Sequence, residues 1–391
     1  MEKFGRGQPV KRVEDVRLLT GHGRFVDDIA PKGALVSAVL RAPMAHGTIA
    51  ALDVSAAREM PGVRMVVTAE DLEAAGVDLG MSFTRVKTRD GGKGAAPMRP
   101  LLAKGRVRFV GEPVAFVVAE TREQAKDAVE AIELDVEALP AHTELAPGGE
   151  ALHDEAPDNV AFDFAMGDVA AVDAALAGSA RTVRVEIPDN RIIVNSMEPR
   201  GYFAEVVEGR LHLCENGQGV WGAKDEICRH LGLSPEEVRV TTPDVGGGFG
   251  MKGAFYPEAA LVAHAARSLG QPVRWMSDRT EAMLSDNQGR DLVTTATLGF
   301  DEKNRITAYK VETLSNLGAY NSNYAQMIQT VLFSKVLPGT YDIQLVSLEV
   351  TGIFTNTTQV DAYRGAGRPE AIFVLEHAMG VAARELGVDP G

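Results

Sequence analysis

Cysteine is scarce in this sequence. Cys214 and Cys228 are the only two among 391 residues. Two cysteines are too few for a disulfide scaffold, and they lack the short paired spacing of a zinc or iron-sulfur site. Both are therefore expected to be reduced thiols in the protein core.

Paired histidines and long apolar runs are also missing. The eight histidines are scattered, with no pair three or four residues apart that could hold one metal ion from a helix. No run of about 18 apolar residues occurs, and residues 1–4 do not begin a basic-then-apolar leader. These absences predict a cytoplasmic protein without a histidine-bound metal and without membrane contact.

Positive charge is in the minority. The sequence has 40 Lys and Arg against 54 Asp and Glu, a net charge of -14 at pH 7. A surface of this sign repels nucleic acid and anionic membranes. We therefore expect neither as a partner, which leaves a small-molecule substrate and other protein chains.

The length and the pattern of the first half predict more than one domain, since 391 residues exceed the usual size of a single core. Apolar and alternating runs predict strands at 35–40, 63–67, 113–119 and 132–138. A capping box of Thr121 and Gln124 predicts a helix from there to Ala131, which completes a β-α-β unit. Residues 145–159 carry breakers and acids without periodicity. We therefore divide the chain into a domain at 1–145, a linker at 146–160 and a second domain at 161–391.

The second domain opens with an alternating strand at 180–186 and contains two units of strand, glycine-rich loop and helix. The first unit has a strand at 238–242, a loop at 243–253 and a helix at 257–269, with proline at its first turn and glycine just after its end. The second has a strand at 353–360, a loop at 361–368 and a helix at 369–386.

A glycine-rich loop between a strand and a helix exposes backbone N–H groups that favour phosphate, so two such loops could hold one long anionic cofactor. Gly248, Gly250 and Gly253 also fit the dinucleotide pattern G-x-G-x-x-G of nicotinamide-binding proteins. Against that alternative, the next helix begins only at Pro257, and the carboxylate Asp278 comes later than such a site requires. A purely structural alternative is that these glycines only permit tight turns, yet Phe249 and Met251 place bulky side chains among them.

The two loops, Val245–Lys252 and Ala362–Arg368, carry a family resemblance. The chain resembles the molybdenum-binding large subunit of the xanthine dehydrogenase, aldehyde oxidase and aerobic carbon monoxide dehydrogenase family. Four further segments support the resemblance: Leu18–Ile29, Arg41–His46, Val110–Val114 and Met197–Gly201. It implies an α+β fold, with an α/β-hammerhead domain followed by the first, incomplete part of the molybdopterin-binding domain.

The resemblance also implies a cofactor, partners and a site. The cofactor would be molybdenum with molybdopterin, in its cytosine dinucleotide form, while a 2Fe-2S cluster and FAD would lie on separate partner subunits. Gln218, Phe249 and Arg364 would lie near molybdenum without being side-chain ligands. The residues implied to bind the cofactor are Gln218, Gly247, Gly248, Phe249, Gly250, Arg364, Gly365 and Ala366.

Departures from the family pattern bear on the substrate. Gly365 stands where the copper-binding cysteine of carbon monoxide enzymes lies, so carbon monoxide oxidation is doubtful. Gly253 and Ala366 replace the acidic and aromatic residues of purine oxidisers, at an expected cost of about 1–2 kcal/mol of binding each. An aldehyde or another N-heterocycle therefore remains as the substrate, with water supplying the oxygen.

The family's general base, a glutamate in a Gly-x-Gly-Glu segment, lies near the far end of a considerably longer subunit. Without a base to take a proton from the water-derived oxygen, this chain alone is expected to be inactive, and it contains no catalytic residue of its own. The chain is therefore expected to be either a fragment of a longer protein or one half of a split subunit, and in the second case a separate C-terminal half is a partner. The alternative is a non-catalytic assembly or binding remnant of such a subunit.

Overall fold

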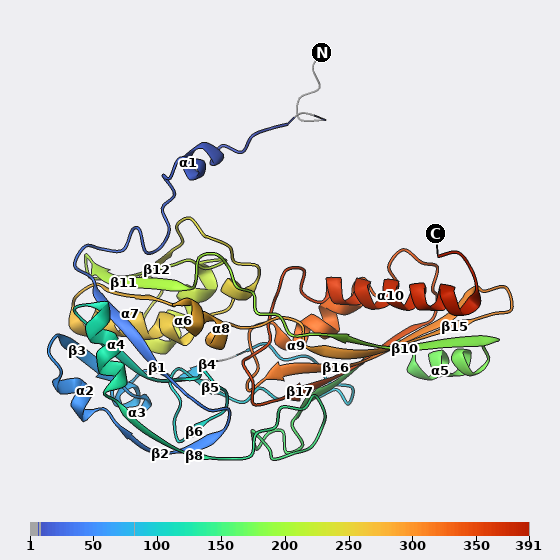
Figure 1. Cartoon of the computed structure of the whole chain (residues 1–391), viewed down its shortest axis with the longest axis horizontal. Coiled ribbons are helices and arrows are strands. Elements are labelled where there is room, and N and C mark those ends of the chain that lie inside the picture. The colour runs from blue at the N-terminus through green and yellow to red at the C-terminus, as the bar shows by residue number, and fades with distance from the viewer. Residues whose placement is uncertain (1–6, 8, 82, 391) are drawn as a thin grey trace.

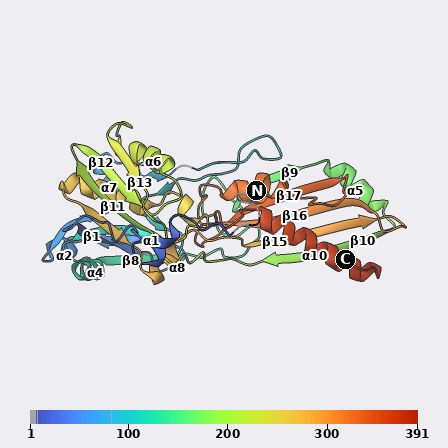
Figure 2. The same cartoon turned by 90° about the horizontal axis from the view of Figure 1, so that it is seen from above.

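The computed structural model describes residues 7, 9–81 and 83–390, so the leader prediction for residues 1–4 lies outside the described residues. The chain forms an elongated molecule with a different β-sheet at each end (Figure 1, Figure 2). An N-terminal arm containing α1 (Asp15–Leu19) extends away from the body, and α1 has no buried residue. The mixed α+β fold is as predicted.

One end of the molecule is built on a seven-stranded sheet with the order β13-β12-β11-β14-β1-β7-β3. The sheet joins strands from both sides of the predicted linker, because β1 pairs in parallel with β14. Its strands are β1 (Leu35–Arg41), β3 (Val63–Val67), β7 (Pro113–Ala119), β11 (Gly201–Val207), β12 (Arg210–Glu215), β13 (Val238–Thr241) and β14 (Val273–Met276).

Helices cover both faces of this sheet. On one face α7 (Pro257–Leu269) packs against β11, β12 and β14, and α6 (Trp221–Leu231) packs beside it. On the other face α4 (Arg122–Glu130) packs against β1 and β7. Smaller helices are α2 (Ser55–Glu59), α3 (Ala69–Ala74) and α8 (Arg279–Ser285). The caps predicted for two of these helices are confirmed: Thr121 and Gln124 form the capping box of α4, and Gly270 ends α7 in the left-handed conformation.

The predicted β-α-β unit is correct in element order but wrong as a unit of one sheet. Strand β8 (Glu133–Ala138) leaves the sheet of β7 and pairs antiparallel with β2 (Gly47–Asp53), which also pairs with β6 (Arg106–Val107). Charged residues alternate with apolar ones along β8, as is typical of a strand with one face in water. β8 therefore lies on an exposed three-stranded sheet, whereas β7 is buried along its whole length. A two-stranded pair, β4 (Gly80–Met81) and β5 (Arg99–Pro100), completes this end.

The other end is a five-stranded sheet with the order β10-β15-β16-β17-β9. Its apolar face packs against α10 (Arg368–Leu386), and α5 (Val169–Ala177) packs against one end of the opposite face (Figure 1). The short helices α9 (Ala325–Met327), η1 (Met251–Gly253) and η2 (Ile328–Leu332) lie in connecting segments. The strands are β9 (Val160–Met166), β10 (Arg181–Asp189), β15 (Leu292–Phe300), β16 (Ile306–Gly318) and β17 (Val346–Phe354).

The strand predicted at 353–360 is wrong in its position, because β17 ends at Phe354. The polar side chains that follow bond to other segments instead of continuing the sheet. Asn356 donates to the Arg108 carbonyl at 2.9 Å, and the Thr358 hydroxyl donates to the Leu284 carbonyl at 2.8 Å. Such side-chain bonds compete with a regular ladder, so the segment continues as an irregular chain that contacts residues of the other end of the molecule before α10 begins.

Residues 146–159 contain no helix or strand, and yet they are packed. Asn159 is fully buried, and its amide donates to the carbonyls of Gly148 and Glu150 at 2.9 Å each. The proposed domain boundaries at 145 and 161 stay a prediction. Among the described residues, no helix is both long and apolar enough to cross a membrane.

Candidate functional site

The two glycine-rich loops meet between the two sheets. The first loop follows β13 of the seven-stranded sheet, and the second precedes α10, which packs on the five-stranded sheet. The backbone N–H of Arg364 donates to the Phe249 carbonyl at 2.8 Å. Gly250 has φ +97°, and a Cβ atom there would lie 2.5 Å from the Ala362 carbonyl oxygen. Only glycine allows this approach, so the predicted pair of loops forms one surface.

Two residues of these loops hold left-handed backbone conformations that non-glycine residues rarely adopt. Phe249 has φ +53° and Ala366 has φ +47°. Each such conformation costs about 1–3 kcal/mol and persists only where its surroundings impose it, typically at functional sites. The Phe249 side chain is 45% exposed, which leaves an apolar ring open at the junction of the loops.

Gln218 joins the first loop from the segment that follows β12. Its side-chain Oε1 accepts a hydrogen bond from the Gly250 N–H at 2.7 Å, and its own backbone N–H donates to the Lys252 carbonyl at 3.0 Å. A Cβ atom at Gly248 would lie 2.5 Å from Gln218 Oε1. Oε1 is held by Gly250, and among the described residues the amide NH2 group of Gln218 has no acceptor, so it can donate to a group outside the protein.

The first loop also presents unused backbone donors. In the part of the chain that the structure describes, the N–H groups of Gly247, Gly248 and Phe249 donate to no protein acceptor. Consecutive free N–H groups form a natural site for anionic or oxo oxygen atoms. A cofactor with such oxygen atoms therefore fits this loop.

Glu198 fixes the first loop from the segment before β11. Its Oε2 accepts from the Gly246 N–H at 2.7 Å and from Lys252 Nζ at 3.2 Å. Burial lowers the pKa of Lys252, and the ion pair with Glu198 opposes that shift. Sequence reasoning quoted Glu198 as part of a supporting motif but gave it no role in the site.

Asp361 fixes the start of the second loop. This fully buried carboxylate accepts hydrogen bonds from the Ser322 hydroxyl at 2.6 Å, the Ala362 N–H at 2.6 Å and the Tyr324 N–H at 3.2 Å. Burial raises the pKa of Asp361, and the bonds from Ser322 and Ala362 offset part of the increase. Asp361 was quoted only as the first residue of the predicted loop.

Arg290 holds the middle of the second loop. It forms a buried ion pair with Glu370 of α10 at 2.7 Å and donates to the carbonyls of Tyr363 and Arg364 at 3.1 and 3.2 Å. The side chain of Arg364 itself is exposed, as is Gly365. A Cβ atom at Gly365 would lie 2.2 Å from the ring of Pro369, so this position has no room for a side chain.

A buried ion network supports the helix behind the first loop. Glu258, in the first turn of α7, pairs with Arg200 at 2.8 Å and with Arg41 at 2.7 Å. Burial alone would raise the pKa of Glu258, but the two guanidinium groups outweigh it and hold the pKa well below its usual range. Arg41 and Arg200 come from two of the segments that carried the family resemblance, so those segments have a structural role in the site.

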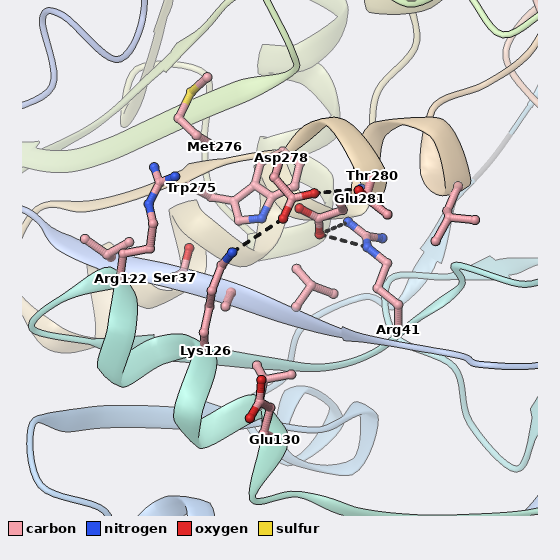
Figure 3. A pocket seen from close by; sticks show the side chains of 15 residues that line it. Ser37, Arg41, Arg122, Lys126, Glu130, Trp275, Met276, Asp278, Thr280 and Glu281 are labelled. Atoms are coloured by element: carbon pink, nitrogen blue, oxygen red, sulfur yellow. Dashed lines mark hydrogen bonds and ion pairs between the residues drawn. The ribbon is translucent and has the colours of Figure 1, made fainter.

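A second hollow lies between α4, β1 and α8, away from the glycine loops (Figure 3). Two ion pairs occupy its wall: Arg41 with Glu281 at 2.7 Å, and Lys126 with Asp278 at 3.5 Å. Arg122 and Glu130 are exposed at its rim. The charged side chains of this wall are already paired within the protein, so the hollow offers a ligand fewer free groups than the glycine loops do.

The loop geometry fits a molybdenum-pterin cofactor better than a nicotinamide dinucleotide. Between Gly250 and α7 lies the short helix η1, so the glycine loop does not lead directly into a helix N-terminus as dinucleotide binding requires. Among the described residues no group of three or more His, Cys, Asp or Glu could hold a metal ion.

Fold and loops together define a cofactor-binding protein of the molybdenum hydroxylase class. Residues 152–391 match the model of the molybdopterin cofactor-binding domain, and residues 20–140 match the a/b hammerhead domain of aldehyde oxidase and xanthine dehydrogenase. The chain therefore belongs to this family of molybdopterin-binding proteins.

Three relatives illustrate the match. The nicotine 6-hydroxylase large subunit of Paenarthrobacter nicotinovorans is 35% identical over 98% of this chain and 47% of its own length. The carbon monoxide dehydrogenase large chain of Afipia carboxidovorans is 29% identical over 98% of this chain and 49% of its own. The structure of quinoline 2-oxidoreductase from Pseudomonas putida 86 superposes with a TM-score of 0.88 at 34% identity, over 97% of this chain and 48% of that one. This chain thus spans about half the length of these relatives.

Proposed function

We propose that this chain supplies the cofactor-contacting loops and one wall of the substrate pocket of a molybdenum hydroxylase. The enzyme would hydroxylate an N-heterocycle or an aldehyde with oxygen derived from water. One observation supports this proposal most directly. Gln218, the strained turn at Phe249 and Gly250, and the loop that contains Arg364 lie on one surface, and this surface has free N–H donors. When bound, the cofactor would supply the two-electron oxidation.

The cofactor-binding residues of the proposal are those of the two loops. Gly247, Gly248 and Gly250 would let it approach the backbone, Gln218 would donate its free amide N–H to it, and Gly365 and Ala366 would form the second loop's contribution. Its form would be the cytosine dinucleotide of molybdopterin. The Phe249 ring, which is exposed to solvent in this chain, would cover the cofactor.

We further propose that the chain works with partner subunits. Subunits with a 2Fe-2S cluster and FAD would carry the electrons away, in the cytoplasm. Because this chain covers about half the length of its relatives, a second half carrying the Gly-x-Gly-Glu base would complete the active site, and this chain alone would be inactive. Two of the relatives have names that refer to N-heterocycles, nicotine and quinoline, which favours that substrate class.

Carbon monoxide and purines are less favoured substrates. At Gly365 the positive φ and the Pro369 ring leave no room for a copper-binding cysteine side chain in this backbone. Gly253 and Ala366 offer neither a carboxylate nor an aromatic ring to a purine.

The variant Gly248→Val tests the assignment of the loop. Its side chain would overlap Gln218, so the Gln218 amide and the backbone approach would both be lost. We expect molybdenum and pterin retention to fall about tenfold or more in protein purified from cells that express all subunits. Cys228→Ala, on α6 and partly buried, is the control and should keep both. Equal retention in the two variants would contradict the assignment.

A further inference from the structure

A pocket opens beside Gln218. Its wall includes Gln218 itself, Lys252, and residues of α6 and of the segment before α9. Gln218 lines this pocket and also contacts the first glycine loop, so a molecule held in the pocket would lie beside the proposed cofactor-binding loop.

Glu215, the last residue of β12, lines this pocket and is only 6% exposed. Its carboxyl group folds over Gly217, where a Cβ atom would lie 2.8 Å from Glu215 Oε1. Within the described residues, the carboxyl group has no hydrogen-bond or ion-pair partner. A buried carboxyl group without a partner is costly, so its presence at a pocket wall points to a ligand that supplies the partner.

The other charged groups of the pocket are already paired. Glu226 pairs with Arg229, and the Lys252 ammonium pairs with Glu198 at 3.2 Å. Among the described lining residues, Glu215 is thus the one acidic or basic side chain that lacks a partner. When Glu215 is ionised, the unmatched charge of the pocket is therefore negative.

Aromatic rings complete the wall of the pocket. Phe83, Phe255 and Tyr324 line it, and Tyr324 is 43% exposed. Aromatic faces attract cations through their quadrupole, and they stack on planar rings. A planar cation satisfies both the rings and the free carboxylate, whereas an anion satisfies neither.

We propose that Glu215 is a specificity-determining residue that pairs with a positively charged nitrogen of the substrate. The inference rests on the proposed function and narrows its substrate class to cationic N-heterocycles and heterocycles that bear a protonated amine. Burial raises the pKa of Glu215 to about 8, and a bound cation would lower it again, so binding would release a proton near neutral pH.

The test compares N-methylpyridinium with toluene, an uncharged molecule of nearly the same shape, binding to the 391-residue chain. Saturation-transfer NMR titrations at pH 8 would measure both affinities. We expect the cation to bind about tenfold or more tightly than toluene, and Glu215→Gln to remove that preference while leaving toluene binding unchanged. Glu205→Gln, which removes a carboxylate paired with His212 outside the pocket, is the matched control and should keep the preference.

Either of two results would overturn the inference: equal binding of the cation and toluene by the unmodified chain, or an unchanged preference in Glu215→Gln. The first comparison needs no variant, so a folding defect cannot obscure it. Molybdenum retention of the complex is measured separately. If the unmodified complex retained no molybdenum, the proposed function would be refuted. If Glu215→Gln retained molybdenum but lost the cation preference, both proposals would be supported.

Discussion

At the scale of single residues, the site depends on a contact that only one side chain permits. Gly250 combines a positive φ with a backbone carbonyl, that of Ala362, at a position where a Cβ atom would collide. The same residue donates its N–H to Gln218. Gly250 therefore couples the first loop both to the second loop and to the Gln218 amide, which we propose faces the cofactor.

The variant Gly250→Ala should separate the loops. We expect the free energy of unfolding to fall by about 1–3 kcal/mol, because alanine in this conformation is strained and the Ala362 carbonyl cannot move freely. Urea denaturation of the chain measures the loss. Gly253→Ala is the control, since its nearest contact would be Gln218 Cβ at 3.9 Å, and it should change stability by less than about 0.5 kcal/mol. Equal stability of the two variants would refute the tight approach of the loops.

The residues that hold the loops were harder to predict from the sequence than the loops themselves. Dense glycines around Phe249 are a local signal, and Gln218 was found through the resemblance of its neighbours. Three residues that hold the loops act through partners far away in the sequence. Glu198 bonds to Gly246, 48 residues away, and Asp361 bonds to Ser322, 39 residues away. Arg290 pairs with Glu370, 80 residues away. Glu215 gave no signal, because an unpaired carboxyl group becomes visible only when its surroundings are known.

At the scale of elements, local chemistry predicted the three helices α4, α7 and α10, while the other helices were not predicted. Pro257 and Gly270 bound α7, and Thr121 with Gln124 starts α4, because caps are made by residues close in sequence. Strand partners are chosen by distant residues, so the separation of β7 and β8 into different sheets was missed. The end of β17 was also missed, since Asn356 and Thr358 bond to segments far away in the chain.

The beginning of the second matched region is attached to the end of the five-stranded sheet by His153. The buried His153 ring donates from Nε2 to the Ala319 carbonyl at 2.6 Å and packs against Tyr320 and Phe354. Burial lowers its pKa from 6.5 to about 4. The ring is therefore neutral in the folded chain at pH values where the unfolded chain already binds a proton.

This difference predicts a pH dependence of stability. Between about pH 6.5 and 4 the unfolded state binds more protons, so stability falls as the pH falls, by up to about 3 kcal/mol, and levels off below pH 4. His153→Gln can still donate to Ala319 but does not titrate, so its stability should lose this component. Urea denaturation at pH 7 and pH 4.5 measures both proteins. The same decrease in the two proteins would show that another group is responsible.

At the scale of the whole molecule, one sheet joins the two matched regions. Strands β1, β7 and β3 come from the hammerhead match, and β11 to β14 come from the cofactor-domain match. The glycine loops then lie where this sheet approaches the second one, with free donors and an exposed Phe249 ring. In the function that we propose, a further polypeptide would cover this surface and complete the cofactor site.

The most direct test is the molybdenum and pterin content of this chain, purified together with a polypeptide that supplies the Gly-x-Gly-Glu segment and with the iron-sulfur and FAD subunits. Plasma mass spectrometry would measure the metal, and fluorescence after oxidation would measure the pterin. The account predicts about one molybdenum and one pterin per copy of this chain. A folded, assembled complex with neither would contradict it.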